Sequence, residues 1–183
     1  RSTPLYSSAA SDVYKRHHYS LCRGKVIIQI DSTLVPNYIH PITLEAAIEV
    51  ASNLRPEDRR EMVEGHGSDP MIYAEEVAEE DSCVWFEVPN GKTAGMAGVG
   101  YGGAVWMLCT PAIEEYPITF IRESKRWVES RPEPLLWNIV DKRNTVHLKL
   151  LQHLGFKFLR EIFYGPNNLS FIEFCRVYGN GRQ

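Results

Sequence analysis

Residues 135–156 (LLWNIVDKRNTVHLKLLQHLGF) constrain the fold more than any other stretch of the chain. The apolar run over 135–140 is typical of a short buried strand. Asn144 can then act as the N-cap of a helix over 144–154, because its side-chain oxygen can accept a hydrogen bond from a first-turn amide. Gly155 stands where helices commonly end in a left-handed conformation. The stretch therefore predicts a strand, a tight turn and a helix, followed by another strand.

The rest of the chain predicts alternating strands and helices. A strand over 37–42 is followed by two helices, over 44–54 and 56–66, with Thr43 placed to cap the first and Pro56 to begin the second. The remaining expected elements are a short helix over 70–80, strands over 82–88, 93–101 and 104–110, a helix over 118–130, and strands over 156–164 and 169–178. Because the 93–101 strand is rich in glycine, it predicts either a close approach to its backbone or room for a bulky neighbour.

The strands and longer helices follow the order β, α, α, β, β, β, α, β, α, β, β, which resembles the GNAT superfamily of N-acetyltransferases. The resemblance implies an α/β (α+β) domain with a mixed, mostly antiparallel central sheet and flanking helices. In that fold the fourth and fifth strands splay apart and acetyl-CoA lies in the gap. Here these strands would be 104–110 and 135–140.

Three regions are expected along the chain. Residues 1–36 form a partly basic N-terminal extension, with KVIIQI (25–30) as a candidate for an added strand. Residues 37–178 form the GNAT-like domain, and residues 179–183 form a tail. The extension is expected to lie on the surface or stay mobile, or else to act as an arm that docks on a partner.

The resemblance also implies a set of site residues. As catalytic candidates it suggests Asn138, which would orient the thioester, and either Glu87 or His147 as the base. The expected cofactor-binding residues are Met107, Leu108, Cys109, Thr110, Asn138 and Asn144. A structural hydrogen bond for Asn138 and a packing role for His147 remain open alternatives.

The sequence departs from the GNAT pattern at two places. The turn that would hold the cofactor pyrophosphate, residues 110–117 (TPAIEEYP), has no glycine, and two prolines remove two amide donors. Glu114 and Glu115 add negative charge where the phosphates would lie. A tyrosine that acts as general acid in many GNAT enzymes is replaced by Leu151. Both departures favour a degenerate acetyl-CoA site.

A second, closer resemblance is to a family of small proteins of short-tailed bacteriophages called internal virion protein A, which are GNAT-like. Three segments carry it: GMAGVGYGGAVWMLCT, RESKRWV and LLWNIVDKRNTVHLKLLQHLGFKF. The matching positions are Gly95, Gly98, Trp106, Met107, Thr110, Arg122, Ser124, Trp127, Asn138, Val140, Asn144, His147, Leu154, Gly155 and Phe156. The resemblance spans residues 40–177 and implies a place in the virion or in the cytoplasm of the infected host.

Charge and cysteine patterns narrow the function classes further. The net charge of -3 gives no basic excess for nucleic acid, although residues 45–87 hold 13 acidic against 3 basic residues. This acidic stretch is either a solvated helical face or a surface that attracts a cationic partner. The four cysteines form no CxxC pair and have no histidine at ligand spacing, so buried free thiols and no metal site are expected. No stretch reaches the length of a membrane span, and no leader resembles a secretory signal.

Two main functions follow. The first is a phage GNAT-fold protein with a degenerate acetyl-CoA site, which is virion-associated or serves in assembly. The alternative is an active acetyl-CoA-dependent N-acetyltransferase that modifies an amine on a host or phage protein. The expected partners are phage virion proteins or a host protein. In a third reading, this chain is an inhibitor or adaptor that binds a host protein through its acidic helices. Self-association remains open.

Overall fold

The structure is a computed structural model that describes residues 19–22, 25–28 and 37–178. The chain divides into two compact units, residues 1–37 and 38–183. In the first unit, β1 (Tyr19–Cys22) pairs antiparallel with β2 (Lys25–Ile28). β2 covers residues 25–28 of the strand expected over 25–30 and belongs to a separate two-stranded sheet, and residues 29–30 lie outside the described residues. The tail expected over 179–183 lies outside the described residues.

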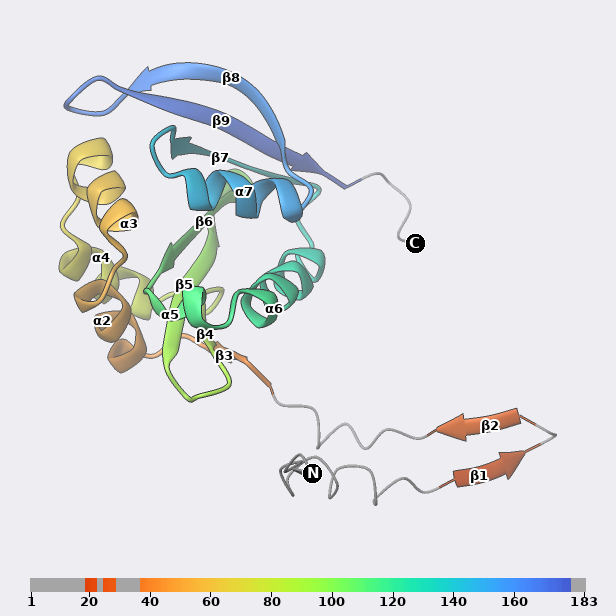
Figure 1. Cartoon of the computed structure of the whole chain (residues 1–183). Helices are drawn as coiled ribbons and strands as arrows, with labels where there is room; N and C mark the ends of the chain where they lie inside the picture. The colour runs from red at the N-terminus through yellow and green to blue at the C-terminus, as the bar shows by residue number, and fades with distance from the viewer. Residues whose placement is uncertain (1–18, 23–24, 29–36, 179–183) are drawn as a thin grey trace, which may run out of the picture. The chain divides into compact units, whose positions relative to one another are not determined.

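The second unit is built on a seven-stranded sheet with the order β3-β4-β5-β6-β7-β9-β8 (Figure 1). Its strands are β3 (Ile39–Pro41), β4 (Val84–Glu87), β5 (Thr93–Gly100), β6 (Ala104–Cys109), β7 (Leu135–Asp141), β8 (Lys157–Tyr164) and β9 (Leu169–Val177). All neighbouring strands run antiparallel except β6 and β7, which are parallel. The mixed, mostly antiparallel sheet expected from the sequence is confirmed.

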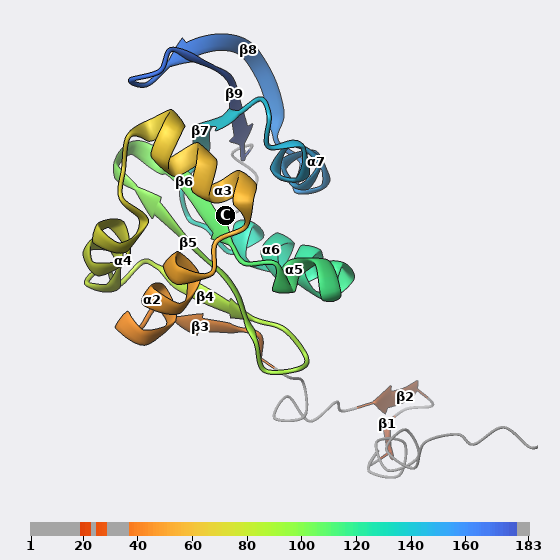
Figure 2. The same ribbon diagram turned by 60° about the vertical axis from the view of Figure 1, so that its left-hand side comes forward.

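Helices cover both faces of this sheet (Figure 2). They are α2 (Leu44–Ser52), α3 (Pro56–Arg60), a π-helical turn (Glu61–His66), α4 (Pro70–Ala78), a 3-10 turn (Tyr101–Gly103), α5 (Ala112–Glu115), α6 (Pro117–Glu129) and α7 (Thr145–His153). One apolar cluster joins α2, α4 and the π-helical turn to the sheet, through residues such as Val50 and Met62. A second cluster joins α5, α6 and α7 to the other face, through residues such as Phe120 and Leu150.

Local signals in the sequence explain most helix ends. Thr43 caps α2 by accepting a hydrogen bond from the amide of Ala46 at 3.2 Å, and Pro56 begins α3. Asn144 caps α7, and Gly155 follows with φ 82°, so both predictions are confirmed. The expected helix over 56–66 is wrong in its second half, because the backbone widens into the π-helical turn Glu61–His66.

The glycine-rich strand β5 makes room for a bulky neighbour, one of its two predicted uses. A Cβ atom on Gly98 would lie 2.7 Å from Cζ2 of Trp106 and 2.6 Å from Sγ of Cys83. The indole of Trp106, on the paired strand β6, also stacks edge-on against Tyr73 of α4 at 5.3 Å between ring centroids. Gly98 is therefore needed for the contact between the sheet and α4.

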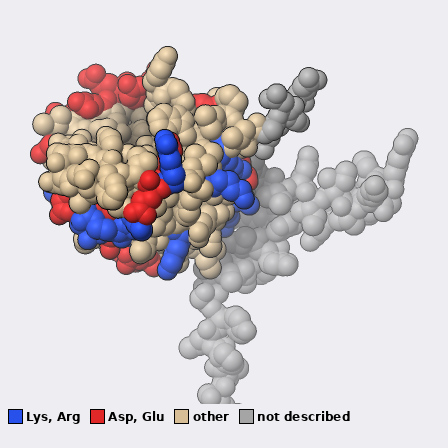
Figure 3. Space-filling view, turned by 90° about the horizontal axis from the view of Figure 1, so that it is seen from above, with Lys and Arg blue, Asp and Glu red and all other residues tan. Residues whose placement is uncertain are grey.

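The acidic stretch over 45–87 is more than a solvated face. Asp58 is buried, Glu49 accepts a hydrogen bond from the Thr93 hydroxyl at 2.7 Å, and Glu64 pairs with Arg143 at 2.9 Å. On the face seen from above, uncharged side chains cover a broad area, with both acidic and basic side chains along its edges (Figure 3). The exposed apolar side chains of β8 include Leu159 and Phe163.

Candidate functional site

The gap between β6 and β7 is the main feature of the sheet. The two parallel strands pair only between Ala104 and Trp137 and then diverge, as the sequence predicted. A cavity of about 350 Å³ adjoins the divergence. Its wall includes Met107 and Leu108 of β6, Asn138 of β7, Trp127 of α6 and His147 of α7. The α3 and α7 helices flank this region (Figures 1 and 2).

Asn138 holds the two strands together just beyond their single backbone pair. Its side-chain amide donates to the carbonyl of Val105 on β6 at 2.9 Å, and its side-chain oxygen accepts from the amide of Ile139 at 2.8 Å. The structural hydrogen bond considered for Asn138 is thus present. The residue also lines the cavity.

A buried polar cluster connects α3 and the π-helical turn to the start of α7. The side-chain amide of Asn144 donates to Oδ1 of Asp58 and to Oε2 of Glu61, each at 2.9 Å. The side-chain oxygen of Asn144 also accepts from the amide of His147. Nδ1 of His147 lies 3.3 Å from Oδ1 of Asp58. Asn144, expected to bind cofactor, therefore has both its donors and its acceptor engaged with the protein.

Arg55 extends this cluster toward the turn after β6. The residue is only 1% exposed, and its guanidinium lies 3.4 Å from Asp58, 3.2 Å from Glu57 and 3.6 Å from Glu114. Its backbone amide donates to the carbonyl of Cys109 at 2.9 Å. The main-chain oxygen of Cys109 is thus already engaged by the protein.

Burial shifts the pKa values of several groups at the cavity. Burial raises the pKa of Glu61 above its ordinary value, although the charge of His147 and the hydrogen bond from Asn144 oppose the shift. Burial also lowers the pKa of His66 and raises that of the Cys109 thiol well above its ordinary value. These shifts favour the neutral forms of the three side chains.

In the turn after β6, the backbone amides from Thr110 to Glu114 donate hydrogen bonds to acceptors within the protein. The donors and acceptors are Thr110 N to Ala94 O at 2.9 Å, Ala112 N to Thr110 Oγ1 at 3.3 Å, Ile113 N to Thr110 O at 3.4 Å and Glu114 N to Pro111 O at 3.0 Å. Since Pro111 has no N–H, every amide from Thr110 to Glu114 has a partner inside the protein. Glu115, at the end of the turn, pairs with Lys92 at 2.6 Å, and this hydrogen bond holds its pKa below the ordinary value.

The structure brings only part of the expected site together. Asn138, His147, Met107 and Leu108 line the cavity, whereas Cys109 and Thr110 are buried behind it. Glu87 is absent from the cavity wall, and its carboxylate lies 3.0 Å from the His40 ring. Sequence reasoning missed Arg55, Asp58 and Glu61, because a charged run at the start of a helix resembles an ordinary solvated first turn. No local signal in the sequence marks them as buried.

Comparison with known proteins identifies the fold. No protein-family model matches the sequence, and no curated protein gives a significant match. Solved structures do match. Ribosomal-protein-alanine N-acetyltransferase from Brucella melitensis aligns over 78% of this chain and 100% of its own, with 13% identity and a TM-score of 0.58. Ribosomal-protein-S5-alanine acetyltransferase from Vibrio fischeri covers 81% and 97%, with 13% identity and a TM-score of 0.53.

A third matching structure was solved with a bound cofactor. The aminoglycoside acetyltransferase AAC(6')-Ib, solved in complex with coenzyme A, aligns over 76% of this chain and 94% of its own, with 17% identity and a TM-score of 0.52. Within the part of the chain that the structure describes, no helix is both long and apolar enough to cross a membrane. The element order, the splayed strands and these matches together show that residues 38–178 have the fold of the GNAT acetyltransferases.

Proposed function

We propose that this chain is a GNAT-fold protein with a degenerate acetyl-CoA site, which binds protein partners instead of transferring acetyl groups. The observation that carries the proposal is the turn after β6. A pyrophosphate needs several free N–H groups directed at it. Between Thr110 and Glu114 all of them are engaged internally, and the carboxylates of Glu114 and Glu115 stand beside them.

The lack of free amides in this turn should weaken binding of the cofactor pyrophosphate strongly. Hydrogen bonds to charged groups contribute about 1.5–3 kcal/mol each, so losing three of them would weaken cofactor binding on the order of a thousandfold or more. So weak a site would stay largely empty at ordinary cofactor concentrations.

The partners that we propose are phage virion proteins. The three sequence segments that resemble internal virion protein A support this choice, and one of them, residues 135–158, supplies β7 and α7 of the cavity wall. A host protein bound during infection is the other source of a partner. Neither role requires acetyl-CoA.

Acetyl transfer is the second candidate, and one observation favours it. The β6–β7 gap opens onto a cavity of about 350 Å³ whose wall includes Asn138 and His147. In this case His147 would take a proton from the acceptor amine, because its Nε2 has no hydrogen-bond partner among the described residues.

Calorimetric titration of the full chain with acetyl-CoA separates the two candidates, with AAC(6')-Ib as the positive control for the ligand. We expect no binding tighter than about 1 mM. Pantetheine, which lacks the phosphates, should bind no more weakly than CoA, because the amides from Thr110 to Glu114 are already engaged within the protein. A micromolar, CoA-specific complex would overturn the proposal and favour the acetyltransferase.

The proposal that the partners are phage virion proteins can be tested separately. Quantitative mass spectrometry of washed virions, from a phage that encodes this chain, should find the protein at copy numbers comparable to those of other minor structural proteins. Its absence from particles but presence in the infected cell would overturn the virion assignment. Affinity capture from infected cells would then identify the host partner.

A further inference from the structure

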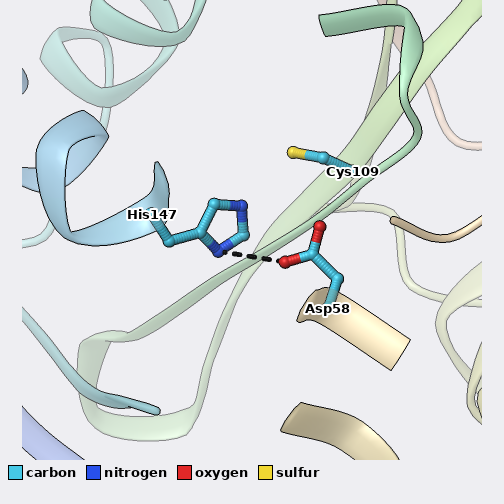
Figure 4. A group of neighbouring side chains, drawn as sticks. All are labelled: Asp58, Cys109 and His147. Atoms are coloured by element: carbon cyan, nitrogen blue, oxygen red, sulfur yellow. Dashed lines mark ion pairs between the residues drawn. The ribbon is translucent and has the colours of Figure 1, made fainter. Parts of the chain in front are cut away.

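Three residues with metal-ligating side chains meet at the wall of the cavity. Asp58 comes from α3, Cys109 from the end of β6 and His147 from α7, and all three are buried (Figure 4). One carboxylate oxygen, the sulfur and one ring nitrogen all lie within 4.8 Å of one another. The sequence predicts no metal site because these residues come from three separate elements.

A second observation points to a missing ligand. Nε2 of His147 is buried and has no hydrogen-bond partner among the described residues, while the other ring nitrogen faces Asp58 at 3.3 Å. Leaving a buried polar atom without a partner costs free energy, and native structures rarely do so without a reason. In Figure 4 the ring of His147 and the thiol of Cys109 point toward one another.

The donor types select the class of metal. A thiolate, an imidazole and a carboxylate suit Zn²⁺ and similar divalent transition ions, whereas Mg²⁺ and Ca²⁺ prefer oxygen ligands alone. In a tetrahedral zinc site the ligand atoms lie about 3.3–3.8 Å apart, so modest side-chain rotations would close the set.

The surrounding charges leave room for a cation. The Arg55 guanidinium lies 3.4 Å from Asp58, but it also faces the carboxylates of Glu57 and Glu114, which offset its charge. Asp58 and His147 also line the cavity, which gives an ion a route to the site.

We propose that Asp58, Cys109 and His147 bind one divalent transition metal ion of the zinc class, with a remaining coordination position toward the cavity. As the metal–sulfur bond forms, the Cys109 thiol releases its proton to solvent. Cys109 itself does not line the cavity. The site is independent of whether CoA binds.

Cobalt(II) titration of the metal-free full chain tests the site. Cobalt bound to a thiolate in tetrahedral geometry gives a near-ultraviolet charge-transfer band and visible bands, and we expect both at one equivalent, with loss on adding Zn²⁺. Cys109→Ser should abolish the near-ultraviolet band. Cys83→Ser, at another buried free cysteine, is the matched control and should keep it. His147→Gln should weaken binding at least tenfold.

Two further outcomes decide the proposal. No thiolate band in the wild-type protein, or a band that survives in Cys109→Ser, would overturn it. If Cys109→Ser does not fold, X-ray absorption of the zinc-loaded wild-type protein replaces that comparison. One sulfur at about 2.3 Å with nitrogen or oxygen at about 2.0 Å is expected. A first shell without sulfur would refute the site.

Discussion

Asn144 is a single residue on which two helices depend. It is wholly buried, caps α7, and donates to the carboxylates of Asp58 and Glu61. In Asn144→Ala the cap is lost, and the buried carboxylate of Asp58 and the partly buried carboxylate of Glu61 each lose a donor. We expect the free energy of unfolding, measured by urea denaturation, to fall by about 2–4 kcal/mol.

The matched control is Asn53→Ala at the end of α2. Asn53 is exposed, and its side chain donates to the backbone carbonyl of Glu49 at 2.8 Å. Because water can replace that hydrogen bond, the free energy of unfolding should change by less than about 1 kcal/mol. Equal losses in the two variants would contradict the role assigned to Asn144.

The stability of the protein should depend on pH through the carboxylate of Asp141. Burial alone would raise the pKa of Asp141, but hydrogen bonds from the side chain and amide of Arg143, with its charge, hold the pKa below its ordinary value. A carboxylate with a depressed folded pKa stabilises the protein above its unfolded pKa of about 3.9, and this stabilisation is lost as pH falls through the folded pKa. The stability difference between wild type and Arg143→Gln should thus be largest near neutral pH.

Urea denaturation at a series of pH values measures this difference. It should shrink as the pH falls below about 4, because the carboxylate of the unfolded chain is then protonated first and the folded Asp141 is protonated only at lower pH. Arg160→Gln is the control, since Arg160 is exposed and its partner Glu173 lies opposite it on β9, beside a shift in the strand register. A wild-type-to-variant difference that stays constant from neutral to acid pH would argue against the Asp141 pairing.

At the scale of the element, the packing of β5 depends on the lack of a side chain at Gly98. In Gly98→Ala the new Cβ would lie 2.6–2.8 Å from Cys83 and Trp106, so one of them must move. Overpacking of this kind costs about 1–3 kcal/mol in unfolding free energy, measured by chemical denaturation. Gly100→Ala in the same strand is the control, because its nearest atom would be Ala104 O at 3.7 Å. Equal losses of unfolding free energy in the two variants would show that strand propensity, and not packing around Gly98, determines the effect.

Elements whose signals are local could be predicted from the sequence. The capped helix α7 and the glycine at its end follow from Asn144 and Gly155, which act within one turn. The π-helical turn Glu61–His66 could not be predicted, because its apolar spacing does not differ visibly from that of an α-helix. The four-residue α5 was missed for a related reason: a single turn has no periodicity to detect.

At the scale of the whole molecule, the sequence supported the fold better than the site. The splay of β6 and β7 follows from the GNAT-like order of elements, and the structure confirms it. The polar cluster depends on Asp58 meeting Asn144, which lies 86 residues further along the chain. Such contacts are set by how helices pack across a sheet, and no spacing rule within one segment reveals them.

The last prediction concerns the independence of residues 38–183. All seven strands of the larger sheet and both apolar clusters belong to this unit, and the carbonyl of Tyr38 accepts from the amide of Glu87 at 2.9 Å. A fragment beginning at Tyr38 should therefore keep its melting temperature within about 3 °C of the full chain, measured by circular dichroism. A fragment beginning at Thr43, which lacks β3, should melt lower, because β4 becomes an unpaired edge. A loss of more than about 10 °C in the longer fragment would mean that residues 1–37 stabilise the core.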